Sequence, residues 1–262
     1  MVVIRQIPDQ VIDAADLFLA KRNELGNIAF QSFPEEACLV FPNEYLVFTA
    51  SPEDINNRYF AQNPEAFIRM EVPTYDDRSD AVVLLANNSE IIDELLYDPD
   101  FHNELLSDFN GVSLERINPN AATQSDENWH SAASSVGYAT PTYQNSQFVP
   151  LSSNPGNQII DIPNKTLSPD DDGFEDVLLI NYQTNDPGFV ATLNIYDSRG
   201  RLVNNLIQNE ILATQGNFKW DGTNNDREKV RIGIYIITGE LVNPNGNIEA
   251  IKESVVVAGR LD

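Results

Sequence analysis

The chain has 262 residues, 42% of them hydrophobic, which is enough for about two domains that each bury a core. Sixteen Lys and Arg against 40 Asp and Glu give a net charge of -24, so neither nucleic acid nor an anionic membrane surface is an expected partner. The single cysteine, Cys38, excludes an internal disulfide and a cysteine-based zinc site, and no run of eighteen apolar residues predicts a transmembrane segment.

Short apolar runs separated by Pro, Gly, Asn and Asp characterise the first half and predict an all-β sandwich. The clusters at Asn23–Asn27 and Asn87–Ser89 are typical of hairpin turns. The predicted strands are Val2–Arg5, Leu17–Ala20, Tyr45–Thr49, Phe67–Met70, Ala81–Leu85, Ile91–Tyr97 and Ser113–Ile117.

One helix is predicted after Ser51, whose hydroxyl can cap it, with Pro52 at the first helical position. A second helical turn is expected at His102 to Leu106. Cys38 lies in an apolar run preceded by two glutamates, so we expect a buried small side chain and no reactive thiol.

Asn, Ser, Ala, Pro and Gln dominate residues 118 to 164, a composition that predicts loop, one last strand and an interdomain linker. After Asp176 the strand pattern resumes and predicts a second sandwich. Ala191 to Asp197 alternates with period two, and Asp197 to Gly200 is a turn signal. The predicted strands are Val177–Tyr182, Ala191–Tyr196, Leu202–Ile207, Gly216–Trp220, Gly233–Glu240 and Ala250–Val257.

No catalytic constellation emerges from the residue pattern, so we expect no enzyme activity. Ser113 lacks the second glycine of a nucleophile elbow. His102 and His130 are the only histidines and do not have zinc-protease spacing, so both are expected to be structural or exposed. Carboxylate pairs are too frequent in so acidic a chain to single out one pair.

The acidic stretch from Ser168 to Asp176 holds the candidate metal ligands. It does not fit a calcium-binding EF loop, because Leu179 stands where a bidentate glutamate is required. Two interpretations stay open: a non-helical calcium site formed by Asp170, Asp172 and Asp176, or an Asx-turn loop that caps the next strand without metal.

Residues 1–147 resemble a bacterial lamin-tail domain. The similarity rests on the order and spacing of several segments, above all Gly111-Val112-Ser113-Leu114-Glu115-Arg116-Ile117, Asn128-Trp129-His130-Ser131-Ala132 and Ala139-Thr140-Pro141-Thr142-Tyr143. This resemblance implies an immunoglobulin-like, non-catalytic module of secreted or surface proteins. The usual first strand of that family is expected to lie before Met1, which would leave an exposed sheet edge able to pair with another chain.

The second half resembles the immunoglobulin-like domain of the flagellar hook-capping protein and the C-terminal domains of gliding-motility and outer-surface proteins. Ser168 to Gly173, Ile195 to Val203, Phe218 to Thr223 and Gly233 to Tyr235 match in order. The resemblance implies that Trp220 belongs to the core, that Asp221-Gly222 is a hairpin turn and that the domain can act as a sorting signal across the outer membrane.

The predicted architecture is therefore two immunoglobulin-like sandwiches: 1–147, a linker 148–164 containing prolines, and 165–262. We expect a non-catalytic interaction, display or attachment region of a bacterial secreted or cell-surface protein, extracellular or on the outer membrane, with a protein or cell-surface partner and with calcium as the one possible cofactor. Two alternatives stay open. One is an accessory region of an extracellular hydrolase whose catalytic domain lies upstream, and the other is a carbohydrate-binding module that uses Trp129, Tyr138 and Tyr143.

Overall fold

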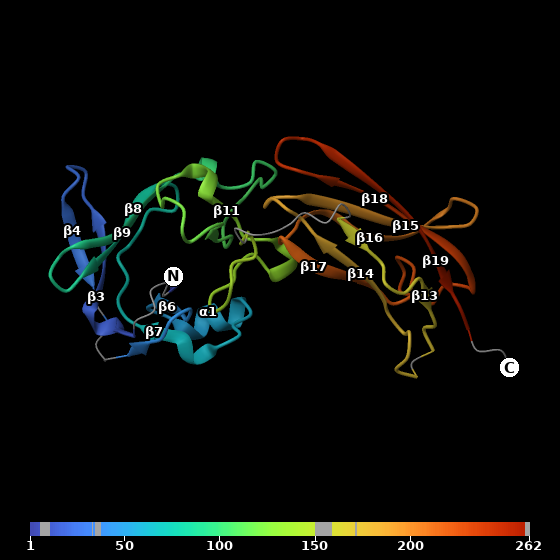
Figure 1. The fold of residues 1–262 in the computed structure, drawn as a ribbon, viewed down its shortest axis with the longest axis horizontal. Coiled ribbons are helices and arrows are strands. Elements are labelled where there is room, and N and C mark those ends of the chain that lie inside the picture. Colours follow the sequence, from blue (N-terminus) through green and yellow to red (C-terminus); the bar gives the residue numbers. More distant parts are fainter. Residues whose placement is uncertain (6–10, 33, 35–37, 150–158, 171, 260–262) are drawn as a thin grey trace. The chain divides into compact units, whose positions relative to one another are not determined.

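The computed structural model describes residues 1–5, 11–32, 34, 38–149, 159–170 and 172–259, and these form two compact units (Figure 1). Unit 1 contains Met1–Ala132 and Val136–Phe148, and unit 2 contains Ala133–Ser135 and Val149–Asp262. Most of the predicted linker, residues 150–158, lies outside the described residues, so the boundaries 148–164 stay a prediction.

Unit 2 is a sandwich of two sheets. The smaller sheet has the order β12-β14-β17, and the larger has the order β13-β19-β18-β15-β16. In Figure 1 the long strands of the larger sheet run beside one another in the yellow to red part of the ribbon. The bounds are β12 Ile160–Asp161, β13 Thr166–Leu167, β14 Leu178–Gln183, β15 Val190–Asp197, β16 Leu202–Ile211, β17 Gln215–Trp220, β18 Gly233–Val242 and β19 Ile248–Val257.

The chain enters unit 2 by contributing to both sheets in turn. β12 pairs antiparallel with β14 in the smaller sheet, and β13 then pairs parallel with β19 in the larger sheet. The second and last strands of unit 2, β13 and β19, thus lie side by side, and the entering chain joins the smaller sheet to the larger one.

One continuous core fills the space between these two sheets. Strands β14 and β15 alternate buried and more exposed side chains, as period-two strands with one face on a core must. Trp220 is 1% exposed and packs edge to face against Tyr235, with ring centroids 5.4 Å apart. The prediction that Trp220 is a core residue is confirmed.

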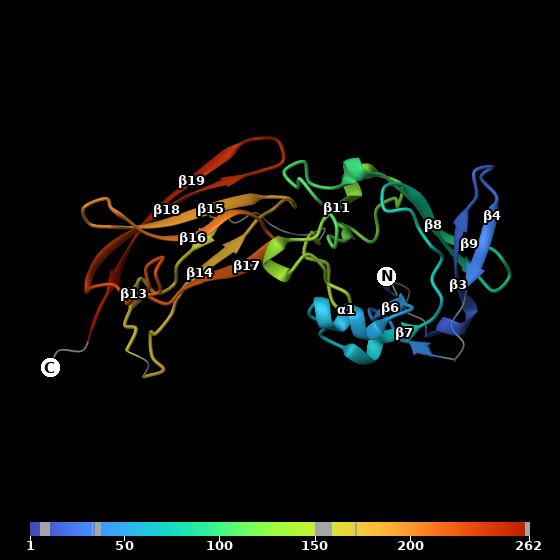
Figure 2. The same cartoon turned by 180° about the vertical axis from the view of Figure 1, so that it is seen from behind.

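Unit 1 is also built almost entirely of strands, in four small sheets with the orders β1-β6-β7, β2-β5, β4-β3-β8-β9 and β10-β11. Figures 1 and 2 show the four strands β3, β4, β8 and β9 together at one end of the unit, apart from β6, β7 and the single helix. The bounds are β1 Val2–Arg5, β2 Ile12–Asp13, β3 Leu17–Arg22, β4 Ile28–Ser32, β5 Leu39–Val40, β6 Tyr45–Thr49, β7 Phe67–Arg69, β8 Asp80–Ala86, β9 Ile91–Tyr97, β10 Leu114–Arg116 and β11 Trp129–Ser131.

Helical structure is short throughout the described residues. The helix α1 spans Pro52–Arg58, as predicted, but the Ser51 side chain makes no capping hydrogen bond, so that detail of the prediction is wrong. The stretch His102 to Leu106, predicted as a helical turn, forms one hydrogen-bonded turn from the Leu106 N–H to the Asn103 carbonyl at 3.0 Å, but no helix. The 3-10 segment lies three residues earlier, where the side chain of Asp98 accepts a hydrogen bond from the backbone N–H of Asp100. The 3-10 segments are Ala14–Asp16, Pro64–Ala66, Pro99–Phe101, Asp126–Asn128 and Ser134–Val136.

The all-β fold class is confirmed, and every predicted strand has a counterpart within a few residues. The hairpins at Asn23–Asn27 and Asn87–Ser89 connect β3 to β4 and β8 to β9. Asp221-Gly222 is a turn but joins no hairpin, because β17 and β18 belong to different sheets and the chain crosses between them there. The strands missed by sequence are mostly of two or three residues, too short for a periodic pattern.

Candidate functional site

The acidic stretch forms a compact loop between β13 and β14. The backbone N–H of Ser168 donates to the carbonyl of Glu175 at 2.7 Å, which closes the loop at its base. Gly173 adopts a positive φ of 88°, a conformation that glycine reaches without strain. The carboxylate of Asp176 accepts the N–H of Gly173 at 2.7 Å, and that of Asp172 accepts the N–H of Phe174 at 2.8 Å.

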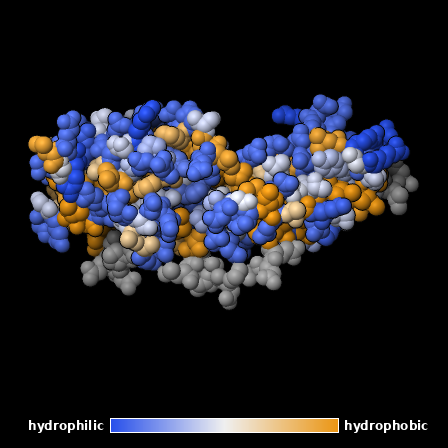
Figure 3. All heavy atoms as spheres, turned by 90° about the horizontal axis from the view of Figure 1, so that it is seen from above, coloured by the Kyte–Doolittle hydropathy of each residue, from blue (hydrophilic) through white to orange (hydrophobic). Residues whose placement is uncertain are grey.

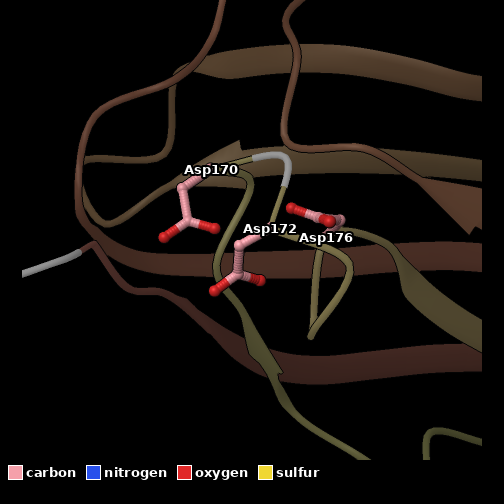
Figure 4. A group of neighbouring side chains, drawn as sticks. All are labelled: Asp170, Asp172 and Asp176. Carbon is pink, nitrogen blue, oxygen red and sulfur yellow. The ribbon is translucent and has the colours of Figure 1, made fainter.

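The loop brings the three predicted ligands, Asp170, Asp172 and Asp176, together, as Figure 4 shows. One carboxylate oxygen from each lies within 4.8 Å of the others. Calcium binds oxygen ligands at about 2.3–2.6 Å, so two ligands of one ion lie at most about 5 Å apart. The three oxygens therefore fit a shared ion in spacing and in chemistry, although the Asx-type hydrogen bonds within the loop also match the metal-free interpretation.

The loop is attached to the rest of unit 2 at one side. Lys229 Nζ donates to the carbonyl of Pro169 at 2.8 Å, and a Cβ placed on Gly222 would overlap the Pro169 ring. Leu179, which interrupts the EF pattern, lies on β14 and is 42% exposed. The loop thus sits where the two sheets are joined, with Asp170 and Asp172 facing solvent.

Both histidines lie in unit 1 and have structural partners, as predicted. His102 Nδ1 is 2.9 Å from Ser131 Oγ, and its ring stacks on Phe109 at a centroid distance of 4.7 Å. Burial, followed by the charge of His130, lowers the pKa of His102 to about 4. Burial also lowers the pKa of His130, whose Nδ1 is 3.0 Å from the carbonyl of Ser131. Ser131 is fully buried, which leaves its hydroxyl no access to a substrate.

Glu115 is a buried carboxylate that the sequence interpretation did not single out. It lies on β10 and is 3% exposed. The hydroxyls of Thr140 and Ser146 donate to it at 2.5 and 2.6 Å, and the N–H of Gln147 donates at 3.2 Å. Burial raises the pKa of Glu115, and these hydrogen bonds oppose the shift. Its position inside a predicted strand, between Leu114 and Arg116, was the available signal. The carboxylate anchors residues 140–147 against β10.

The three aromatic residues considered for carbohydrate binding are all half-buried. Trp129 Nε1 donates to the carbonyl of Thr123 at 2.7 Å, and Tyr143 packs edge to face with Phe60 at a centroid distance of 5.8 Å. Tyr138 has a positive φ of 69° and its carbonyl accepts from Ser113. Each ring therefore has a packing or turn role in unit 1.

The helices in the described part of the chain are all too short or too polar to cross a lipid bilayer. On the visible face in Figure 3, hydrophilic side chains cover much of the surface, with apolar patches between them.

Comparison with protein families gives one match. Residues 160–256 match the family described as CHU_C Type IX secretion signal domain, which covers less than half of the chain. No curated protein sequence matches the chain significantly. The matched segment begins at β12 and ends within β19, so it contains both sheets of unit 2.

Among solved structures, FlgD from P. aeruginosa is 19% identical, with 40% of this chain and 78% of that chain covered and a TM-score of 0.28. PorU from Porphyromonas gingivalis, in its dimeric latent form, is 12% identical over 94% of this chain and 16% of its own, with a TM-score of 0.29. PorZ from Porphyromonas gingivalis is 15% identical over 91% of this chain and 32% of its own, with a TM-score of 0.29. The chain thus spans about a sixth of PorU and a third of PorZ, and these distant similarities carry no functional argument.

Unit 2 therefore contains a secretion-related β-sandwich domain, and the protein is secreted, cell-surface or outer-membrane-associated. The predicted sorting-type domain is confirmed at this level. The lamin-tail resemblance of residues 1–147 lies outside the matched segment and stays a prediction.

Proposed function

We propose that this chain is a non-catalytic region of a protein exported by a type IX secretion system, and that residues 160–256 are its sorting signal. The match of these residues to the type IX secretion signal family carries the proposal. The fold supports it, because the matched segment corresponds to one complete sandwich with its own core and not to a fragment of a larger sheet.

The position of strand β19 favours a sorting signal that the secretion machinery recognises as a folded domain and not as an unfolded peptide. It is flanked by β13 and β18, and Val255 and Val257 are buried in the core. A receptor can reach the solvent-facing side chains of this strand only on the surface of the sheet, because removing the strand from the sheet would expose the core.

Export is tested by fusing the full chain behind a signal peptide and a fluorescent reporter in a bacterium that has a type IX secretion system. The reporter is expected on the cell surface or in the medium, and in the periplasm of an isogenic strain that lacks the translocon. The reporter without the chain serves as the control. Equal distribution of the fusion in the two strains would contradict the proposal.

For unit 1 we propose an interaction or attachment role, in line with its lamin-tail resemblance. The packing of Trp129 and Tyr143 supports this role over carbohydrate binding, because sugar-binding aromatic rings need an exposed face.

We further propose that the loop from Ser168 to Asp176 binds calcium through Asp170, Asp172 and Asp176, with water completing the coordination. The common spacing of their oxygens within 4.8 Å favours it. Calorimetric titration of the full chain should give calcium binding in the range of about 10⁻⁴–10⁻³ M that is typical of extracellular modules.

The matched variants for the calcium titration are Asp172→Asn, which removes a ligand charge, and Asp186→Asn, which removes an exposed charge elsewhere in unit 2. Binding should be weakened by the first and unchanged by the second. No heat of binding at millimolar calcium would leave the loop as a metal-free turn.

A further inference from the structure

Unit 1 contains a cavity of about 1580 Å³ that is open to solvent. This exceeds the roughly 300–1,000 Å³ of ordinary small-molecule pockets. Protein interiors are normally packed as densely as organic crystals, so a space of this size in one unit calls for an occupant. The cavity lies wholly within unit 1 and is lined by residues of several of its sheets.

Strand β8 shows how the cavity divides the unit. Ala81, Val83 and Leu85 on one face are buried in a small apolar cluster. Val82 and Leu84 on the other face line the cavity and are only half-buried, and Leu84 also packs against the cluster that contains Leu19 and Phe48. Apolar side chains therefore face a space that no element among the described residues fills.

Three strands line the cavity along their whole length, β1, β2 and β10, and the two longer ones are β1 and β10. Within the described sheets β1 pairs only with β6, and β10 pairs only with β11. A strand with one neighbour has a second edge whose N–H and C=O groups can pair with an added strand. On β10 this edge is partly occupied, because the carbonyl of Arg116 accepts from Asn145 Nδ2 at 2.9 Å, so the free edge is that of β1. A free strand edge suits an extended polypeptide better than a compact small molecule.

Two arginine side chains in the cavity wall keep an unused donor. Arg5 binds Asn43 and lies over the Tyr45 ring, and Arg116 pairs with Asp93 at 3.0 Å. The Nε atoms of Arg5 and Arg116 are nonetheless buried without a hydrogen-bond partner among the described residues. A buried unsatisfied donor is costly, and the carbonyl groups of an extended peptide are acceptors that could satisfy both.

The charge around the cavity sets the chemistry of the partner. The four inner acids are already engaged: Glu115 with three donors, Asp93 with Arg116, Glu94 with Arg22, and Asp13 with the N–H groups of Ala15 and Cys38. The exposed charged residues that line the cavity are five aspartates and a single arginine: Asp16, Asp54, Asp76, Asp77, Asp98 and Arg78. Such a border attracts a cationic partner and repels an anionic one.

We propose that this cavity binds an extended segment of a partner protein that adds as a strand beside β1, places alternate apolar side chains against Val82 and Leu84, and carries lysine or arginine at its flanks. The inference deepens the interaction role proposed for unit 1. Its test uses purified chain and is independent of export from cells, so the two proposals can fail separately.

The test measures binding of labelled synthetic peptides to the full chain by fluorescence anisotropy at low salt. The first probe is a ten-residue peptide that alternates valine and serine, with two lysines at each end. One comparison peptide has glutamates at the ends, and another keeps the lysines but carries N-methyl groups on alternate backbone amides. Saturable binding is expected for the first peptide, with at least a tenfold loss for each of the other two.

Hydrogen exchange locates the bound peptide. On saturation, exchange should slow at those amides of Val2–Arg5 that do not pair with β6, and elsewhere in unit 1 to a lesser degree. Strand addition is overturned if β1 shows no added protection, or if the N-methylated peptide binds as tightly as the first.

Matched charge variants test the border of the cavity. The double variant Asp76→Asn with Asp77→Asn should weaken the lysine peptide at least threefold and reduce its salt dependence. The control, Glu24→Gln with Glu104→Gln, removes two exposed charges outside the cavity and should leave binding unchanged. The proposal is overturned if both double variants weaken binding of the lysine peptide equally. It is also overturned if free lysine oligomers bind as tightly as that peptide, because either result would mean that an acidic chain attracts any cation.

Discussion

The two units use similar strands to build cores of different kinds. In unit 2, nineteen buried residues form one cluster between two sheets. In the described part of unit 1, most of the buried apolar residues form two smaller clusters, and a cavity lies beside them. Apolar burial stabilises at roughly 25 cal/mol per Å², so a divided core leaves less of this stabilisation available. Unit 1 depends correspondingly more on polar anchors such as Glu115.

This contrast matters for function, because sites that bind partners are drawn from the less stable parts of a protein. A closed sandwich such as unit 2 suits a domain that must keep one surface intact during export. An incompletely filled unit with polar anchors suits a module that gains stability when a partner binds. Hydrogen exchange measured on proteolytic fragments gives the stability of each unit separately. It can therefore test this difference in stability between the two units with substitutions of single residues.

The largest effect is expected at the centre of unit 2. Leu193 on β15 is fully buried, so Leu193→Ala should lower the free energy of unfolding of unit 2 by about 2–5 kcal/mol. Leu179→Ala, at a solvent-exposed position on β14, should cost less than about 1 kcal/mol. The comparison fails if the amide hydrogens of unit 2 exchange at the same rate in the two variants. It also fails if Leu193→Ala destabilises unit 1 as much as unit 2.

Neighbouring positions on β8 should respond in opposite ways to a larger side chain. Val83→Phe adds volume to a packed cluster and should cost about 1–3 kcal/mol. Val82→Phe directs the same volume into the cavity and should change stability by no more than about 0.5 kcal/mol. Denaturant midpoints of unit 1 provide the measurement, and equal losses would mean that the cavity is not available space.

Glu115→Gln tests the polar anchor of unit 1. The amide retains one acceptor oxygen but presents a donor to the second hydroxyl, so a loss of about 1–3 kcal/mol is expected in unit 1 and none in unit 2. Faster exchange should be concentrated in residues 140–147 and β10. Unchanged exchange there would show that the carboxylate does not anchor this segment.

Acid should weaken unit 1 before unit 2, since both histidines lie in unit 1. Burial lowers the folded pKa of His102 to about 4 from its ordinary 6.5, so the unfolded chain binds more protons between these values. The contribution of neutral His102 to the stability of unit 1 is therefore fully present above pH 6.5 and is lost as the pH falls toward 4. Allowing for solvent screening, this contribution is about 1–2 kcal/mol.

Buried Glu115 has the opposite effect on the pH dependence of unfolding. Because burial raises its folded pKa, its contribution to the free energy of unfolding falls as the pH rises above its ordinary pKa of 4.5. The histidine effect is therefore the difference between the wild type and His102→Gln, measured by urea unfolding at pH 7 and pH 4.5. An identical pH dependence in the two proteins would remove His102 as the cause.

The smallest effect is expected at the surface of unit 2. Lys165 pairs with Glu253 at 2.7 Å, and their side chains are 54% and 29% exposed. Lys165→Gln should therefore cost only about 0.2–1 kcal/mol, and less at high salt. A loss comparable to that of Leu193→Ala would mean that the closed core is not the main source of stability in unit 2.

The sequence predicted the strands well because period-two alternation, as in Ala191–Asp197, reflects burial on one face only. It predicted that Asp170, Asp172 and Asp176 could meet because they lie within seven positions around a glycine turn. It missed Glu115 because the partners of that carboxylate are at least 25 residues away, and missed the cavity because its walls come from segments far apart in the sequence. Both are consequences of long-range packing, which local patterns do not encode.

The parallel pairing of β13 with β19 also has a mechanical meaning. The backbone bonds from Val256 to Lys165 and from Ala258 to Leu167, at 2.8 and 2.7 Å, connect the segment that enters unit 2 with the strand at its far end. A force that pulls the entering chain and the end of β19 in opposite directions loads these parallel bonds in shear, together, and does not open them one after another. Once the short pairing of β12 with β14 has opened, tension between the two ends of unit 2 is held by these parallel bonds before it reaches the other strands of the sandwich.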